Sequence, residues 1–295
     1  DHRVLGKQNF LLIDEVQMCD GFERAINSLH ASEQYDIFIT GSNAFLLSSD
    51  LSTLFTGRTF EIEVFPFSFE EYRLYGDEGD VDRDFDEYAR IGGMSGSYPY
   101  PLQEQRYQYL SNVFKTLIVR DIVQRHNVRN ESALLRIADY MMDNVSNITS
   151  ARNITDALNA DGLKITNKTV GTYMGYLCDA FAFYKVRRYD IRGKKYLKSG
   201  EKYYLADHAF KYALLGTRDM DWGRVYENMV AIELLRRGYE VYVGVLYKKE
   251  IDFVAQRGSE KIYIQVSDNI SGQETFEREC SPLLQIRDAY PKMII

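Results

Sequence analysis

The chain has 295 residues, of which 45% are hydrophobic, enough for two or three packed domains and too many for a disordered protein. Its formal net charge of −7 is not that of a protein whose whole surface binds nucleic acid. No apolar run approaches the roughly 20 residues of a membrane span. The three cysteines lie far apart and form neither a metal-binding C-x-x-C pair nor an even disulfide set. We therefore expect a protein of the reducing cytoplasm with no membrane segment.

Residues 1–65 alternate short apolar segments with helical ones, a pattern that predicts a parallel α/β sheet. The predicted elements are strand 10–14, helix 21–30, strand 36–40, helix 43–48 and strand 59–64. The first strand ends in Asp14-Glu15, and the second ends in the polar stretch Thr40-Gly41-Ser42-Asn43. An acidic pair at a strand end is typical of P-loop ATPases, in which one acid holds Mg²⁺ and the other polarises the attacking water. The alternative is a strand that simply ends in solvated acids.

The phosphate-binding loop of such ATPases, G-x-x-x-x-G-K-[ST], does not occur in the 295 residues. In P-loop folds it precedes the acidic strand, and here only nine residues precede that strand. We therefore expect the chain to be a fragment that binds no ATP or Mg²⁺ and hydrolyses little or no ATP by itself. Arg58 is a candidate arginine finger that senses the γ-phosphate, with a solvated loop residue as the alternative.

Residues 131–205 have the element order of a winged helix-turn-helix. Helices at 131–145, 153–160 and 167–180 precede two strands near 181–189 and 196–205. The segment from Lys185 to Lys202 contains eight basic residues and only two acidic ones. This excess of positive charge predicts a basic wing that contacts phosphates. Contact with a protein partner, or a merely solvated basic face, is the alternative. The candidate DNA contacts are Lys164, Lys168, Arg192, Lys194, Lys195 and Lys198.

Residues 206–295 show the α-β-β-β-α-β order of a restriction-endonuclease-like core. The elements are helix 223–237, strands 239–245, 250–256 and 261–267, a helix from about 273, and a strand at 291–295. Asp252 lies on the second strand with the expected alternation, and Glu227 on the helix can add a carboxylate. Gln265-Val266-Ser267 stands where a nuclease carries acid-x-Lys, so we predict a vestigial nuclease site. The rival hypothesis is a Mg²⁺-dependent DNA nuclease that acts at Asp252.

Several segments occur together and in a specific order. They are LLIDEVQ, ITGSNAFLLSSDLSTLFTGR, VFPFSFEEY, IVRDIVQR, KYYLADHAF, EIDFVAQ and IYIQVS. With them the chain resembles, over nearly its whole length, the AAA-type ATPases of bacteria and archaea that carry a C-terminal winged-helix plus restriction-endonuclease-like domain. The chain departs from this pattern in lacking the phosphate loop and in having Ser95 where the family usually has proline.

The resemblance implies ATP and Mg²⁺ as cofactors of the intact protein. It places Asp14 on Mg²⁺, Glu15 on the attacking water, and Asn43, with Ser42 beside it, as the nucleotide sensor.

The predicted fold class is therefore α/β plus α, with a partial P-loop AAA-type sheet, a helical and winged-helix middle, and a PD-(D/E)XK nuclease-like C-terminal domain. The predicted boundaries are 1–65 for the ATPase core, 66–130 for a helical lid and linker, 131–205 for the winged helix, and 206–295 for an incomplete nuclease-like domain. We expect an ATPase coupled to a DNA or protein partner. The alternatives are the nuclease at Asp252 and a non-catalytic binding module. The oligomeric state is not predicted.

Overall fold

The computed structural model describes residues 7–41, 59–76, 79–197, 200–217, 220–247 and 249–295. The chain divides into two compact units, one that runs to Val64 and one that starts at Phe65, with the short segment Asp179–Phe181 grouped with the first.

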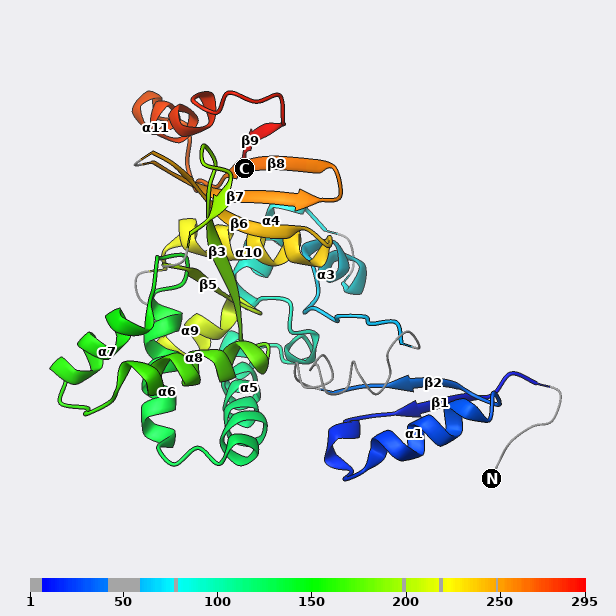
Figure 1. The fold of residues 1–295 in the computed structure, drawn as a ribbon. Coiled ribbons are helices and arrows are strands. Elements are labelled where there is room, and N and C mark those ends of the chain that lie inside the picture. The colour runs from blue at the N-terminus through cyan, green and yellow to red at the C-terminus, as the bar shows by residue number, and fades with distance from the viewer. Residues whose placement is uncertain (1–6, 42–58, 77–78, 198–199, 218–219, 248) are drawn as a thin grey trace. The chain divides into compact units, whose positions relative to one another are not determined.

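The first unit contains two parallel strands, β1 (Phe10–Ile13) and β2 (Asp36–Ile39), joined by the 3-10 turn η1 (Val16–Met18) and by helix α1 (Phe22–Ala31) (Figure 1, blue). Alternate residues of each strand face α1. The resulting core holds Phe22, Ile26 and Val16 packed against Ile13, Ile37 and Ile39.

The other face of these strands is apolar but open in the described part of the chain. The side chains of Phe10, Leu12 and Phe38 are 57%, 76% and 51% exposed. Strands that are apolar on both faces are typical of parallel sheets covered on both sides.

The strand expected at 59–64 is not formed, because these residues belong to none of the described sheets. Their alternating Phe60, Ile62 and Val64 suit a strand, but a strand also needs a paired backbone. The helix expected at 43–48 lies outside the described residues.

The second unit begins with a series of helices, of which α3 (Phe69–Tyr75), α4 (Val81–Ile91) and α6 (Glu131–Asp143) start at a side-chain cap. Ser68 accepts a hydrogen bond from the Glu71 N–H while the Glu71 carboxylate accepts one from the Ser68 N–H, a reciprocal capping box. Between α4 and α6 lie the short η3 (Ser95–Ser97), α5 (Gln103–Thr116) and the π-helical η4 (Leu117–Gln124), which continues α5.

Two further helices and a hairpin follow in the predicted order. Helix α7 (Ala151–Ala160) is capped by Ser150, and the Asn159 amide bonds the backbone of Ile165 across the turn to α8 (Asn167–Asp179). Strand β3 (Phe183–Asp190) pairs antiparallel with both β4 (Lys195–Tyr196) and β5 (Lys202–Leu205).

Helix α9 (Ala209–Leu215), which was not predicted, comes next. The elements after it follow the predicted order: α10 (Trp222–Arg236), β6 (Glu240–Leu246), β7 (Lys249–Arg257), β8 (Glu260–Gln265), α11 (Gln273–Leu284) and β9 (Lys292–Ile294). The strand order is β4-β3-β6-β7-β8-β9, with β5 also on β3 (Figure 1). The β3–β6 and β8–β9 pairs are parallel, whereas β6–β7 and β7–β8 are antiparallel.

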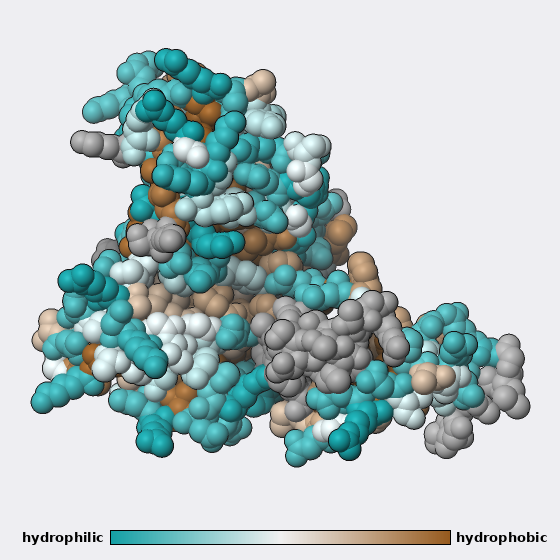
Figure 2. All heavy atoms as spheres, viewed as in Figure 1, coloured by the Kyte–Doolittle hydropathy of each residue, from teal (hydrophilic) through white to brown (hydrophobic). Residues whose placement is uncertain are grey.

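The hairpin strands and the C-terminal strands thus form one sheet in one compact unit. The boundaries predicted at 130/131 and 205/206 fall inside this unit and stay predictions about its segments. The face of the protein seen in Figure 2 is mostly hydrophilic, with scattered hydrophobic patches.

Candidate functional site

The acidic pair of the first unit lies at the end of β1, beside the end of β2. The Thr40 N–H donates to the Ile13 carbonyl at 2.9 Å, which places Thr40 next to the acids. Its hydroxyl bonds the Asp14 carboxylate, and the Glu15 N–H donates to the Thr40 Oγ1 at 3.1 Å. The two strand ends therefore meet in one polar cluster.

The backbone of Glu15 is in the left-handed region, with φ 48° and ψ 48°. A non-glycine residue is uncommon there, and such conformations concentrate at functional sites. Thr40 holds the Asp14 carboxylate in place, and carboxylate oxygens are ligands that Mg²⁺ accepts. Sequence reasoning missed Thr40, although it opens the polar stretch after the second strand. The predicted sensors Ser42, Asn43 and Arg58 lie outside the described residues.

A second polar cluster lies in the C-terminal unit, between β5, α10 and β7. The Lys202 ammonium is 2.9 Å from the Glu227 Oε1, 2.6 Å from the Glu250 Oε1 and 3.8 Å from the Asp252 Oδ1. The Tyr204 hydroxyl donates to the same Glu227 oxygen at 2.7 Å. Lys202 is only 3% exposed and Asp252 8%, so this is a buried ion cluster.

The predicted residue Gln265 joins the cluster through the backbone of β7. Its amide oxygen accepts a long bond of 3.4 Å from the Asp252 N–H, and its amide nitrogen donates to the Glu279 Oε2 at 2.9 Å. The Asp252 Oδ2 accepts from the Val266 N–H at 2.9 Å. The structure therefore brings the predicted Glu227, Asp252 and Gln265 together and adds four residues that sequence reasoning did not place there: Lys202, Tyr204, Glu250 and Glu279.

A β-bulge sets the position of Asp252. Tyr242 pairs with Val254 and Gly244 pairs with Ile251, so Asp252 and Phe253 both lie opposite the single residue Val243. Such a bulge re-aims side chains and is common beside active sites. The regular alternation expected around Asp252 is therefore wrong at this point.

Lys202 was counted among the eight basic residues between Lys185 and Lys202, and the structure removes it from the basic surface. Strand β5 is buried at all four residues, so Lys202 adds nothing to a solvated basic surface. A lysine can be buried in this strand because its charge is paired with the carboxylates of Glu227 and Glu250.

The cluster shifts the pKa values of its members. Burial, and then the neighbouring Glu227 charge, raise the pKa of Asp252 to about 7. Burial lowers the pKa of Lys202, but the charges of Glu227, Glu250 and Asp252 outweigh burial and raise it above the usual range. Lys202 is therefore fully protonated at neutral pH, whereas Asp252 titrates near neutrality.

The raised pKa of Asp252 predicts a pH-dependent stability. For an acid whose folded pKa exceeds its unfolded value of 3.8, the stability contribution is complete below 3.8 and is lost as the pH rises through about 7. We expect the stability advantage of the wild type over Asp252→Asn to fall by on the order of 2 kcal/mol between pH 4 and pH 8. Urea unfolding of both proteins across this range measures the change, and a constant difference would contradict the pKa assignment.

The predicted DNA contacts are exposed where they are described. Lys164 lies in the turn between α7 and α8, Lys168 lies in the first turn of α8, and Arg192, Lys194 and Lys195 lie in the β3–β4 hairpin. The Arg192 guanidinium lies 5.2 Å from the ring centre of Tyr247. Lys198 lies outside the described residues.

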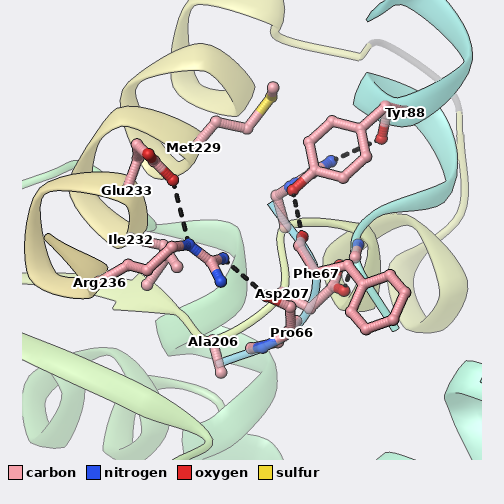
Figure 3. Close-up of a pocket in the computed structure, with 11 residues that line it drawn as sticks. Pro66, Phe67, Tyr88, Ala206, Asp207, Met229, Ile232, Glu233 and Arg236 are labelled. Carbon is pink, nitrogen blue, oxygen red and sulfur yellow. Dashed lines mark hydrogen bonds and ion pairs between the residues drawn. The ribbon is translucent and has the colours of Figure 1, made fainter. Parts of the chain in front are cut away.

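A small pocket lies where α10 meets the segment before α3 (Figure 3). Arg236 donates to Glu233 at 3.0 Å and to the Pro66 carbonyl at 2.6 Å, while Asp207 accepts from the Gly93 N–H at 2.7 Å. The cavity of about 20 Å³ holds on the order of one water molecule. We interpret it as a structural junction, since it is too small for a nucleotide.

In the described part of the chain, no group of three or more His, Cys, Asp or Glu side chains is arranged to hold a metal ion. Among the same residues, no helix has both the length and the apolar character needed to cross a membrane.

Comparison with known proteins agrees with the α/β character of the first unit. Residues 2–73 match the model of the AAA domain, and residues 82–221 match a domain of unknown function, DUF8612. The chain is thus related to the AAA-type ATPases.

Over 293 residues the chain is 38% identical to an uncharacterized protein of Haemophilus influenzae, a match that covers 97% of this chain and 72% of the relative. The chain belongs to the family of that protein. It is also 26% identical over 271 residues to the uncharacterized protein MJ1544 of Methanocaldococcus jannaschii, which covers 87% of this chain and 60% of that relative.

Proposed function

We propose that the protein is an AAA-type ATPase whose nucleotide state is coupled to its C-terminal unit. The observation that carries this proposal is the polar cluster at the ends of β1 and β2, within the segment that matches the AAA domain. Asp14 would hold Mg²⁺ bound to ATP, and Glu15 would activate the attacking water. Ser42, Asn43 and Arg58 are proposed to sense the nucleotide. The test is ATP hydrolysis by the Glu15→Gln variant, which is described in the Discussion.

We further propose that residues 131–205 form a winged helix-turn-helix that contacts DNA or a protein partner. The order of α7, α8 and the β3–β5 strands supports this proposal, as does the exposure of the basic residues of the hairpin. A cytoplasmic location is part of the same proposal.

The wing makes a specific prediction for DNA binding. Changing Arg192, Lys194, Lys195 and Lys198 together to Ala should weaken binding and flatten its salt dependence, because each lost phosphate contact removes about one unit from the log–log slope. Fluorescence anisotropy with a labelled duplex at several salt concentrations measures both quantities. Binding that responds neither to salt nor to these changes would remove the wing from the interface.

For the C-terminal segment we propose a nuclease-like fold without nuclease turnover. The element order from α10 to β9 supports the fold, and Glu227, Asp252 and Gln265 are its vestigial site. A Mg²⁺-dependent nuclease needs carboxylates free to bind the metal and a lysine free to stabilise the nucleophile. Here the carboxylates are bonded to a buried lysine instead.

We therefore expect no cleavage when the purified protein is incubated with plasmid and single-stranded DNA in Mg²⁺ or Mn²⁺. Gel electrophoresis reads the result. Cleavage that disappears in the Asp252→Ala variant would favour the rival nuclease function.

A further inference from the structure

The Lys202 ammonium lies among three carboxylates that come from two elements. Glu227 is on α10, and Glu250 and Asp252 are on β7, where the bulge places Asp252 toward the same cluster. Lys202 itself comes from β5, which among the described strands pairs only with β3. One buried cation is thus held by three oxygens that converge from two separate parts of the chain.

This arrangement has the charge pattern of a carboxylate metal site with the metal replaced. Oxygen-rich sites for Mg²⁺ place carboxylates at 2.0–2.1 Å from the ion, and Ca²⁺ takes oxygens at 2.3–2.6 Å. The three oxygens here lie 2.6–3.8 Å from the ammonium nitrogen, as a larger cation requires. To reach the ligand distance of Mg²⁺, the nearest oxygen would need to move inward by about 0.5 Å and the farthest by about 1.7 Å.

We propose that the Lys202 ammonium stands in the place of a divalent cation, so that Glu227, Glu250 and Asp252 as they lie do not fit a metal ion and would take an oxygen-preferring ion such as Mn²⁺ or Mg²⁺ only once the ammonium is removed. The inference deepens the proposed nuclease-like fold without turnover, but it rests on side-chain geometry and does not depend on the ATPase proposal.

The geometry does not favour Lys202 as a replacement for the catalytic lysine that a nuclease carries in its acid-x-Lys motif. Such a lysine must have an N–H free for the nucleophile or the phosphate. The ammonium of Lys202 already donates to Glu227 and lies 2.6 Å from Glu250, and its side chain is only 4% exposed. Its donors are committed to the protein.

The test is Mn²⁺ binding to the whole 295-residue chain. Electron paramagnetic resonance measures the binding through the signal of the Mn²⁺ that remains free. The wild type should show no site that depends on Asp252. The Lys202→Met variant, which keeps the length of the side chain without its charge, should bind one Mn²⁺ at least tenfold more tightly, and adding Asp252→Asn should abolish this gain. Mn²⁺ should also raise the melting temperature of Lys202→Met but not of the wild type.

The matched control is Lys185→Met, which removes one positive charge from β3 at a side chain that is 48% exposed. It should leave Mn²⁺ binding unchanged. If it strengthens binding as much as Lys202→Met does, general net charge explains the effect and the proposal fails.

If Lys202→Met does not fold, the double variant Lys202→Met/Glu250→Gln decides the question. It removes one carboxylate with the ammonium and leaves Glu227 and Asp252 for the ion. Mn²⁺ binding above the wild-type level supports the proposal. A folded variant that binds no more Mn²⁺ than the wild type overturns it, as does a wild type whose own Mn²⁺ site is lost in Asp252→Asn. Neither outcome bears on ATP hydrolysis, so failure here is distinguishable from failure of the ATPase proposal.

Discussion

Replacing Lys202 with Met should lower the free energy of unfolding by about 3–5 kcal/mol, the usual cost of removing one partner from a buried ion cluster. The variant leaves Glu227, Glu250 and Asp252 buried without their shared cation. Part of the cost is avoided if a carboxyl takes up a proton, and Asp252, with its pKa near 7, is the one that does so most readily. Urea unfolding should be measured at pH 8, where protonation of Asp252 offsets the least of the cost.

Two comparisons make the result specific to the cluster. Lys185→Met removes an exposed ion pair with Glu201 at 3.9 Å and should cost less than about 1 kcal/mol. Adding Glu250→Gln to Lys202→Met removes one of the unpaired charges and should recover part of the loss. A Lys202→Met protein as stable as the wild type would show that the cluster contributes no stability through its charges.

The local pattern of the sequence predicted most of the C-terminal elements. Helix α10 and strands β6–β8 differ from their predicted bounds by only a residue or two, because turn residues such as Gly238 and Gly258 separate these segments. Helix α8 begins at the predicted residue Asn167, but its cap is the preceding Thr166, whose hydroxyl oxygen accepts a hydrogen bond from the Thr169 N–H at 3.2 Å.

The features that sequence reasoning missed depend on contacts between distant residues. Lys202 reads as one more member of a basic run, and only the packing of β5 against α10 and β7 shows that it is buried. The bulge at Asp252 follows from pairing with β6, which a single strand pattern does not contain. The strand expected at 59–64 had the right alternation but has no described partner strand.

The largest functional effect is expected from Glu15→Gln in protein that contains these residues together with a complete AAA domain. The amide keeps the shape of the carboxylate but cannot take the proton of the attacking water, so hydrolysis should fall by about 10²–10⁴-fold. ATP binding should persist, because Asp14 and its bond to Thr40 remain. Asp20→Asn, an exposed acid in the turn before α1, is the matched control and should leave turnover unchanged.

Steady-state release of phosphate from Mg²⁺–ATP, measured beside equilibrium binding of a fluorescent ATP analogue, tests the ATPase proposal most directly. We expect the protein with the complete domain to turn over ATP only when Mg²⁺ is present, and the Glu15→Gln variant to bind the analogue as tightly while releasing almost no phosphate. Turnover by Glu15→Gln at the wild-type rate, or a wild type that neither binds nor hydrolyses ATP, would contradict the assignment of this acidic pair to ATP hydrolysis.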